Sequence, residues 1–492
     1  MTSDTAVKII SHRDDRNPAL VAEFAKNHLR YDGTPFAGLL SPTSTLIPAS
    51  AAARLPADAA AVDRWYEGLL DLYLDLLDKN DDTDLLHQLE WGLDPDMRRL
   101  QRDSARRRDR PRIGRLDCVD LGSDHFVTEV QWKGAGEGWL AAIDRSYRTV
   151  FPLADGHRPF GDLVQAWAGV FAGDGCSVNT GRRGWGDAEQ FLTSEVARLG
   201  TRLAWSDFDA ITTMLRNDGD QIVVDHDGQT HPLHHLFLDR LTEVMPVPLI
   251  DALATAAAAG HIVLDTPPSY LFNQKLPLAL PFTPGYEQYF PDAIRTTLIP
   301  TIVLDPGSPD LGVLAPYLRH DDRDAVASLD SWDDVPGLPE QLRGLLVVKC
   351  GSIDQFRNHG GQGVHRLDGA PEQAAATLKL VLDRAVPLGE PWVIQPYLGH
   401  RWSVPATLMS RPDELTTLDL HAKFGVYLHL SERAGPAPQV LGGVASLGTT
   451  WKVSGASKTP ASIDDDGVWH GAFRHDIRVE NDQPLAGGQP HA

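Results

Sequence analysis

Residues 115–131 read RLDCVDLGSDHFVTEVQ, and this stretch predicts a β-hairpin. The turn-forming triplet Gly122-Ser123-Asp124 separates two short apolar-rich runs, Leu116 to Leu121 and Phe126 to Trp132. Side chains alternate between the two faces of a strand, so polar residues spaced two apart share a face. The hairpin therefore offers one polar face to the rest of the chain.

A turn at that triplet also determines which residues lie opposite each other. Asp117 falls opposite Glu129, and Arg115 falls opposite Gln131. Two carboxylates and an amide on one face supply oxygen ligands for a hard divalent cation. Because opposed carboxylates repel each other, this register is most favourable with a cation between them. The alternative is an exposed hairpin face, on which acidic side chains are ordinary.

The composition is that of an ordinary globular protein with more than one subdomain. The chain has 492 residues, of which 42% are hydrophobic and 23% are charged. Its formal net charge of −22 argues against a nucleic-acid partner, because phosphate contacts need a basic surface. A local basic site for a small anionic ligand remains compatible with this charge.

Cysteine usage and the first residues bear on the compartment. Cys118, Cys176 and Cys350 form neither a CxxC pair nor a zinc pattern, a usage typical of a reducing cytosol. The opening MTSDTAVKIISHRDDRN lacks the apolar core of a signal peptide, and no apolar run reaches membrane-spanning length. We therefore expect a cytoplasmic protein without a membrane partner.

Residues 1 to about 110 predict a mostly helical region. Val62 to Asp78 and Pro95 to Arg107 have the residue pattern of helices. The basic run Arg106 to Arg112 is interpreted as a solvated helix end. No motif assigns chemistry to this region, which could form a substrate cap or the surface of a homodimer.

Residues 156 to 270 alternate short strands and helices, which predicts an α/β layer with parallel pairing. Pro232 to Arg240 is a helix candidate within this layer. His231, His234 and His235 lie near its start and suggest a metal site. A metal role is disfavoured, because Pro232 occupies a helix start and no nearby acid completes a known ligand pattern.

The region from about 340 to 455 carries the most informative pattern. An apolar strand, Leu345 to Lys349, ends in a lysine and leads into a glycine-rich stretch that contains Gly360, Gly361 and Gly363. A helix follows from Pro371 to Ala385, beginning with the proline that helix starts often carry.

The same region then returns to strands. Trp392 to Leu398 predicts a strand that leaves into a linker, and Leu418 to Leu430 and Gly443 to Val453 predict two more. Together with the preceding helix, these strands predict a small α+β lid.

The strands, glycine loop and lysine of this region are suited to binding a nucleotide. A lysine at a strand end can reach a phosphate as a point charge. A glycine loop can fold over phosphates because its backbone N–H groups approach without obstruction. A strand entering a linker offers bare backbone groups that can read an adenine edge. Each feature alone has an ordinary structural explanation, whereas their joint presence in this order indicates a nucleotide site.

The order and spacing of the motifs resemble a circularly permuted ATP-grasp ligase, similar to the synthetase domain of glutathionylspermidine synthase and to ATP-grasp peptide ligases of natural-product pathways. The resemblance covers roughly residues 111 to 457. It rests on Arg115-Leu116-Asp117, Glu129-Val130-Gln131, Asn273-Gln274-Lys275, Lys349 with Gly360-Gly361-Gln362-Gly363, and Gln395-Pro396-Tyr397-Leu398.

Three features depart from the family pattern. Gln131 replaces the usual asparagine, and its amide oxygen is carried by a longer side chain. Cys350 follows Lys349 where proline is common. The glycine loop is unusually long and carries Arg357 and His359. These departures bear on metal geometry and on closure of the lid.

The resemblance implies an ATP-dependent carboxylate–amine ligase that uses ATP and Mg²⁺. Such an enzyme joins an acid to an amine through an acylphosphate and releases ADP and phosphate, here on a small molecule or peptide. The rival functions are a phosphotransferase on the same scaffold and a nucleotide-binding partner protein without turnover. The sequence identifies neither the acid nor the amine.

The resemblance also implies residue roles. It assigns Arg115 to the transferred phosphoryl group or acylphosphate as the catalytic residue. It assigns Asp117, Glu129 and Gln131 to Mg²⁺. ATP would be held by Lys275, Lys349, Gly360, Gly361, Gly363, Gln395, Tyr397 and Leu398. Three further cations, Arg401, Lys423 and Lys452, are equally well explained as solvated surface charges.

The implied fold is a circularly permuted ATP-grasp fold of the α+β or α/β class with a helical N-terminal region. The expected divisions are a helical region 1–110, a magnesium-binding lobe 111–205, an α/β domain 206–335, a lid and adenine-binding subdomain 336–457, and a loosely ordered tail 458–492.

Overall fold

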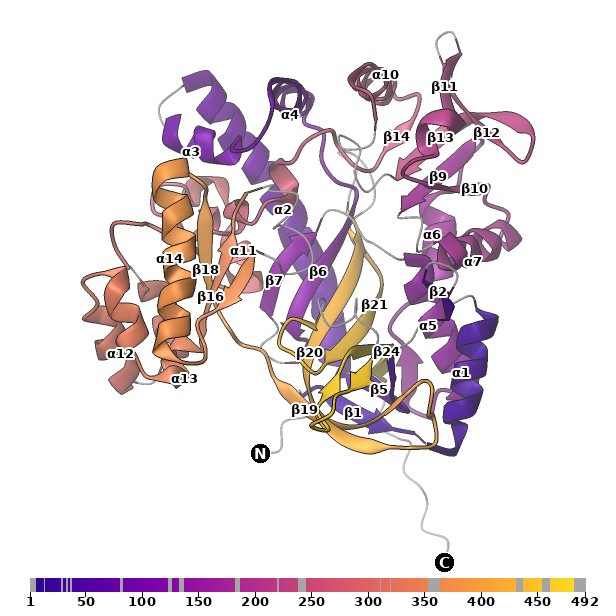
Figure 1. The fold of residues 1–492 in the computed structure, drawn as a ribbon. Helices are drawn as coiled ribbons and strands as arrows, with labels where there is room; N and C mark the ends of the chain where they lie inside the picture. Colours follow the sequence, from indigo (N-terminus) through magenta and orange to yellow (C-terminus); the bar gives the residue numbers. More distant parts are fainter. Residues whose placement is uncertain are drawn as a thin grey trace, which may run out of the picture.

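The structure is a computed structural model, and it describes residues 6–12, 14–27, 30–31, 34–35, 38–79, 83–122, 126–131, 137–181, 186–218, 221–237, 245–309, 311–318, 320–352, 363–430, 437–453 and 461–481. The architecture is mixed α+β, with a large central sheet between two smaller ones (Figure 1). No helix in these ranges is both long and apolar enough to cross a membrane. All three cysteines are unpaired and buried.

The central sheet joins segments from the two ends of the chain. Its main path runs β1-β5-β24-β21-β20-β19-β4, with β6 and β7 attached through β20, and β8 through β24. The strands are β1 Lys8–Ser11, β4 Leu39–Leu40, β5 Thr43–Ile47, β6 Ile113–Asp120, β7 Phe126–Gln131, β8 His157–Pro159, β19 Arg401–Leu408, β20 Thr416–His429, β21 Gln439–Gly448 and β24 Ala472–Glu480.

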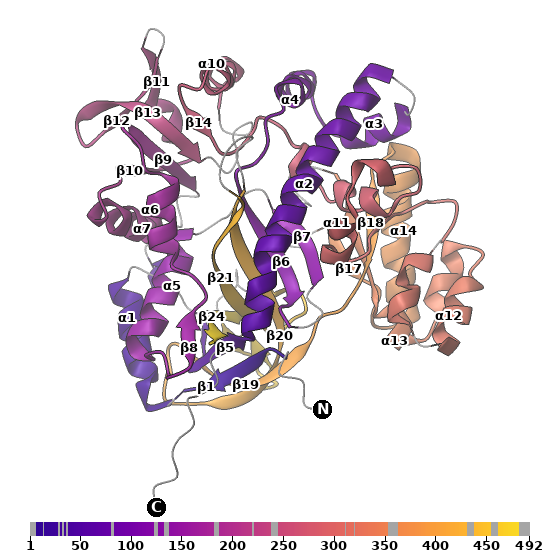
Figure 2. The same ribbon diagram turned by 180° about the vertical axis from the view of Figure 1, so that it is seen from behind.

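One face of this sheet is covered by α2, Ala49–Lys79, as Figure 2 shows from behind. The helix extends well beyond the predicted range because Ala and Leu continue towards its start. Its buried Trp65, Tyr66 and Tyr73 pack in one core with Phe424 and Val426 of β20. Burial of this apolar face is the main stabilisation available to so long a helix.

The expected helical region 1–110 is therefore only partly helical. α1 Asn17–Lys26, α3 Thr83–Leu89 and α4 Pro95–Arg107 are helices, but β1 and β5 belong to the central sheet. β5 is short and fully buried, and it pairs with β24 in parallel and with β1 in antiparallel orientation.

The basic run that follows α4 is less solvated than its composition suggests. α4 ends at Arg107, and Arg108 closes it with a left-handed backbone at φ 61°. Arg108 then binds Glu67 and Asp71 of α2, both at 2.8 Å. Arg110 bridges Asp63 and Glu67 with its side chain only 10% exposed. These arginines tie the chain leading into β6 to α2.

The second sheet has the order β10-β9-β13-β12-β11, with β14 beside β13. β9 pairs in parallel with β10 and β13, and β13 with β14, which confirms the predicted parallel pairing for these strands. β12 is antiparallel to both β11 and β13, so the prediction is wrong for that part of the sheet. The helices of this part of the chain are α5 Glu137–Val150, α6 Leu163–Val170, α7 Gly186–Arg198 and α10 Val247–Ala258. The strands are β9 Cys176–Gly181, β10 Leu203–Asp207, β11 Leu215–Asp218, β12 Gln221–His226, β13 Gln229–Phe237 and β14 Val263–Leu264.

Two further expectations about this sheet are wrong. The predicted helix from Pro232 to Arg240 begins inside β13, which pairs with β9 on one side and β12 on the other. Leu233 and His235 are buried at strand spacing, and this period decides against a helix. The expected division between residues 205 and 206 cuts through β10, whose pairing with β9 spans it.

The third sheet is small and has the order β15-β18-β16-β17. Its strands are β15 Ile302–Val303, β16 Leu346–Cys350, β17 Val364–Arg366 and β18 Trp392–Pro396, and α14 Pro371–Leu388 packs on them. The predicted helix at Pro371 is confirmed. The later strands β19 to β21 belong to the central sheet, however, so the expectation that they complete the lid is wrong.

The prediction that residues 458–492 form a loosely ordered tail is also wrong for part of that segment. β24 is almost wholly buried and lies between β5 and β21. Its charged residues are internally paired, since Arg478 binds Asp476 at 2.8 Å and donates to the Phe151 carbonyl at 2.6 Å. The segment 461–470 adds the short β22 Ser462–Ile463 and β23 Trp469–His470. The final eleven residues lie outside the described ranges.

Candidate active site

The early hairpin has the predicted register. Asp117 of β6 pairs with Glu129 of β7, and Arg115 pairs with Gln131. A register shift at Cys118 interrupts the ladder directly afterwards. The turn residues 123–125 lie outside the described ranges. On its other side β6 pairs with β20, so the hairpin extends a sheet built from much later residues.

The polar face of the hairpin continues across the central sheet. Paired residues share a face, so the rows Tyr427–Arg115 and Gly425–Asp117 place β20 residues beside the hairpin charges. The row Arg474–Ser446–Lys423 extends this face over β21 and β24. The alternate residues, Leu116, Cys118, Phe424, Val426, Ala445 and Leu447, are buried in the core that contains α2.

Asp117 is the centre of a buried ion network. Arg115 donates to it through Nε at 2.7 Å and Nη2 at 3.2 Å, and Lys423 Nζ lies 2.6 Å from its Oδ2. Gln131 donates to the same carboxylate at 3.1 Å and accepts from Arg115 at 2.5 Å. Burial raises the pKa of Asp117, but the charges of Arg115 and Lys423 outweigh it and lower the pKa to about 2.

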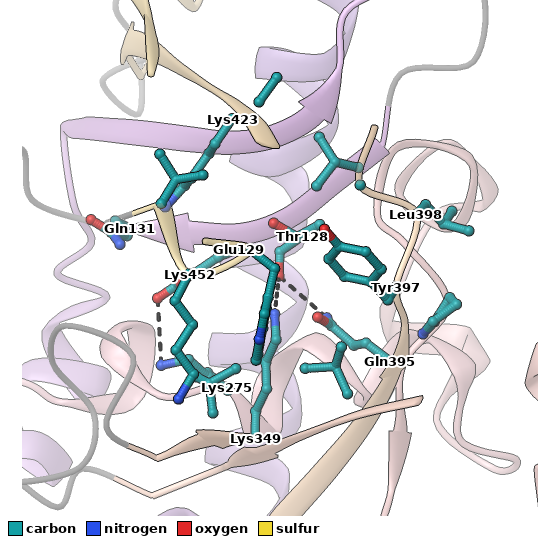
Figure 3. A pocket seen from close by; sticks show the side chains of 18 residues that line it. Thr128, Glu129, Gln131, Lys275, Lys349, Gln395, Tyr397, Leu398, Lys423 and Lys452 are labelled. Carbon is teal, nitrogen blue, oxygen red and sulfur yellow. Dashed lines mark hydrogen bonds and ion pairs between the residues drawn. The ribbon is translucent and has the colours of Figure 1, made fainter. Parts of the chain in front are cut away.

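Glu129 faces two lysines that come from distant segments. Lys275, between two short 3₁₀ turns at Leu271–Asn273 and Leu276–Leu278, places Nζ 3.5 Å from Glu129 Oε1. Lys349, near the end of β16, donates to the Thr128 carbonyl at 3.3 Å. Figure 3 shows both lysines reaching towards β7 from the same side. Burial raises the pKa of Glu129, but the neighbouring lysines, Lys275 foremost, lower it overall.

Lys349 itself is nearly buried, with 8% of its surface exposed. Burial lowers its pKa to about 8, while the carboxylate of Glu129 opposes that change. A desolvated ammonium gains strongly from an anionic ligand that can replace its lost hydration.

These groups line one pocket between the hairpin, the third sheet and β20. Of the sequence-predicted residues, the pocket brings together Glu129, Gln131, Lys275, Lys349, Gln395, Tyr397 and Leu398. Arg115 and Asp117 do not line it. Their side chains are 16% and 1% exposed, and they contact Gln131 and Lys423, which do line it. Gly363 is buried beside β16 and accepts from Cys350 N at 2.7 Å. Gly360 and Gly361 lie outside the described ranges.

Lysine is rare in this chain and concentrated at the pocket. The sequence has ten lysines against 35 arginines, and Lys275, Lys349, Lys423 and Lys452 all line the pocket. Four other lysines have side chains at least half exposed: Lys8, Lys26, Lys79 and Lys379. Of the two alternatives that the sequence leaves open for Lys423 and Lys452, a site residue or a solvated surface charge, their position at the pocket favours the first. The scarcity of lysine was the signal in the sequence that could have found them.

The far end of the pocket is aromatic. Tyr397 follows β18, Trp451 meets its ring edge-on at 5.9 Å, and Arg366 lies 4.0 Å over the tyrosine ring. Trp451 was not anticipated from the sequence. Gln395 donates to the Thr301 hydroxyl at 2.7 Å and to the Thr128 carbonyl at 3.3 Å, which ties β18 to β7.

The protonation of His421 determines how Tyr397 can bind a ligand. Arg401 Nε donates to His421 Nε2 at 3.1 Å, so the histidine must accept there. Burial and Arg401 lower the pKa of His421 to about 4, so the ring is neutral and its proton is on Nδ1. Nδ1 then donates to the Tyr397 hydroxyl at 2.8 Å. That hydroxyl can donate its own proton to a ligand.

The hairpin donors are oxygen ligands of the kind that a hard divalent cation such as Mg²⁺ takes. Glu129 and Gln131 line the pocket, Asp117 pairs with Glu129 across the hairpin, and the Gln131 amide oxygen accepts from Arg115. Mg²⁺ is commonly held by one or two carboxylates together with waters and substrate phosphates. Among the described residues, no group of three or more His, Cys, Asp or Glu side chains could hold a metal. His235 instead pairs with buried Asp265 at 2.6 Å.

Comparisons with known proteins give distant likenesses among solved structures. No family model and no curated protein matches the sequence. A glutathione synthetase-like effector from Globodera pallida aligns over 95% of this chain and 96% of its own, with 10% identity and a TM-score of 0.49. A provisionally named gamma-glutamylcysteine synthetase from Methylobacillus flagellatus aligns over 78% and 83%, with 11% identity and a TM-score of 0.36.

Proposed function

We propose that this protein is an ATP-dependent carboxylate–amine ligase with a circularly permuted ATP-grasp arrangement. One observation carries the proposal. Four scarce lysines and the hairpin carboxylate of Glu129, drawn from distant segments of an acidic chain, converge on a single pocket with an aromatic end. A triphosphate needs concentrated positive charge, and a nucleobase needs flat apolar surface beside polar backbone.

In this proposal the nucleotide extends from the aromatic end to the hairpin. Gln395, Tyr397 and Leu398 border adenine, while Trp451 closes the far side of the base. Lys275 and Lys349 bind the phosphates as point charges. Mg²⁺ would be held by Glu129 and Gln131 with Asp117 close by, and when bound it neutralises phosphate charge.

The reaction has two group transfers. A carboxylate oxygen of the acid forms a bond to the γ-phosphorus, and the bond to the β,γ-bridging oxygen breaks, so ADP leaves. The amine nitrogen then bonds to the carbonyl carbon of the acylphosphate, the carbon–oxygen bond to phosphate breaks, and inorganic phosphate leaves. The proton lost by the amine passes to solvent or phosphate. The protein contributes mainly by positioning the reactants and stabilising charge.

Arg115 is the protein's own positive charge at the reacting end. Asp117 accepts hydrogen bonds from Nε and Nη2 of Arg115, and Gln131 accepts one from Nη2. These bonds fix the guanidinium of Arg115 on the sheet face. A preorganised cation stabilises charge on a transferred phosphoryl group without reorganisation during the reaction. Lys423, held 2.6 Å from Asp117, adds a second fixed charge beside it.

Hydroxylamine provides a test that needs no knowledge of the natural amine. It traps acylphosphates as hydroxamates, so a panel of carboxylates is incubated with ATP, Mg²⁺ and hydroxylamine. The proposal expects an acid that gives equal amounts of ADP, phosphate and hydroxamate. A phosphorylated product that forms without amine would indicate a phosphotransferase instead. ATP binding without ADP formation for any acid would indicate a nucleotide-binding protein without turnover.

A further inference from the structure

A further cationic residue on the pocket face of the central sheet comes from the last strand of the fold. Arg474 of β24 is in register with Ser446 of β21, and Ser446 with Lys423 of β20. Lys423 lines the nucleotide pocket, whereas Arg474 does not. Two strand spacings separate their backbones, which is about 10 Å. Arg474 therefore lies on the same face, on the side of Lys423 away from the hairpin.

The side chain of Arg474 is held in a defined orientation. Its Nε donates to the Ser446 hydroxyl at 3.1 Å, and its guanidinium lies 4.2 Å from the ring centre of Trp139 in α5. The indole covers one flat face of the guanidinium, so a ligand would meet its edge, where the N–H donors are. Arg474 is neither fully buried nor exposed, so it retains access to solvent.

The electrostatics around Arg474 favour an anion. Burial lowers the pKa of Arg474 to about 10, with Arg115 contributing as a nearby like charge. Both arginines remain protonated at neutral pH. Asp117 engages Arg115 directly, while Tyr427, which is close enough to both cations to sense their charges, is a neutral phenol because burial raises its pKa to about 12. An anion bound by both guanidinium groups would relieve their repulsion.

We propose that Arg474 and Arg115 together bind the carboxylate of the acid substrate beside the reacting end of the nucleotide. This inference rests on the function proposed above and adds a residue that no part of the ATP-grasp resemblance assigns. Guanidinium edges match a planar carboxylate, and two of them can fix its orientation for attack on phosphorus. Arg474 is then a substrate-binding residue supplied by the C-terminal strand.

The test uses acetate as the probe, because it is the simplest carboxylate and its methyl signal reports weak binding by saturation-transfer NMR. The full-length protein is measured alone and with saturating ADP and Mg²⁺. Arg474→Met removes the charge, and Arg474→Lys keeps it without the fork of donors. Arg216→Met is the matched control, since Arg216 is an exposed arginine on the edge strand β11. ADP affinity is measured by calorimetry for every variant.

We expect acetate affinity to fall at least about tenfold in Arg474→Met, because a charge-assisted contact is lost. Arg474→Lys should lose less, Arg216→Met should match the wild type, and ADP affinity should stay within twofold in all three. If Arg474→Met does not fold, the loss of acetate affinity in Arg474→Lys relative to Arg216→Met tests the inference.

Several results would overturn the inference. Unchanged acetate binding in Arg474→Met would do so, as would a wild-type protein that binds no acetate. Binding of inorganic phosphate at Arg474 in place of acetate would assign the two arginines to the phosphoryl group instead. Failure of the wild type to bind ADP would reject the proposed ligase function, while the nucleotide-free acetate titrations would still report on Arg474.

Discussion

Consecutive residues of β20 serve two different surfaces. Phe424 and Val426 point into the apolar core with α2, whereas Lys423, Gly425 and Tyr427 face the charged side of the sheet. The core face is made of side chains that need only apolar neighbours of suitable volume. The charged face can bind a ligand only if residues from β6, β7, β16 and β24 lie close together in the folded protein. Stability and chemistry are therefore separated by the alternation of one strand.

Substitutions on the core face should act on stability alone. Phe424 is fully buried and packs against Trp402 with a ring distance of 5.5 Å. Phe424→Ala should lower the free energy of unfolding by about 3–5 kcal/mol, through lost burial and the cavity left behind. Denaturant unfolding followed by circular dichroism measures this effect. Phe424→Leu should cost clearly less, and equal losses in both variants would show that β20 does not pack as described.

A substitution on the charged face should act on chemistry alone. Glu129→Ala removes the pocket-facing carboxylate and should reduce ADP formation at least about 100-fold, as loss of a preorganised charge does. Its free energy of unfolding should change little, because Glu129 is only partly buried. The acid-dependent rate of ADP release measures this, with Lys379→Met, an exposed lysine on α14, as the control. Full activity in Glu129→Ala would remove the magnesium assignment.

The pocket that contains Lys349 should take up protons when it binds a nucleotide. The pKa of Lys349 is about 8 in the free protein, and phosphates should raise it, because they favour the ammonium form. At pH 8 about half of the molecules must gain a proton on binding, whereas near pH 6.5 almost all are already protonated. Calorimetry in buffers of different ionisation enthalpy measures this uptake. Lys349→Met should abolish it and weaken ADP binding, and uptake that persists in this variant would contradict the assignment.

The smallest effect should come from Gly425, which lies between Lys423 and Tyr427 on the charged face. A Cβ at Gly425 would lie 3.1 Å from Arg115 Cδ, so the arginine must shift by a few tenths of an ångström. Gly425→Ala should reduce the rate of ADP formation by about two- to tenfold at unchanged ADP affinity, because small misplacements weaken positioned charges. Steady-state kinetics and calorimetry separate the two quantities. A matching loss of ADP affinity would place Arg115 at the nucleotide itself.

Local patterns were sufficient for the hairpin and for several helices. A turn triplet between two apolar runs determined that Asp117 would lie opposite Glu129, and the proline at Pro371 marked the start of α14. The register shift at Cys118 could not be foreseen, because it depends on how β6 also pairs with β20.

Long-range pairing accounts for the errors. The polar run Asp464-Asp465-Asp466 and the Gly/Pro ending predicted a loosely ordered tail, whereas that segment contains β24. β24 is buried because Asp476 and Arg478 neutralise each other, and because β5, some 430 residues earlier, pairs with it. β13 resembled a helix start because of Pro232, but its partners β9 and β12 determine its conformation.

The residues of the candidate site also fall into two groups, those predicted by local motifs and those placed by long-range pairing. Residues within motifs, such as Lys349 and Gln395, could be named from order and spacing and lie at the pocket. Lys423, Trp451 and Arg474 belong to no motif, and their positions depend on sheet register that the sequence does not display. Only the scarcity of lysine hinted at Lys423.

A crystal structure with ADP and Mg²⁺ tests the central claim most directly. We predict adenine beside Tyr397 and Leu398, the diphosphate at Lys275 and Lys349, and a magnesium ion on Glu129. Nucleotide bound elsewhere on the protein, with these lysines still directed at Glu129 and Thr128, would contradict the account.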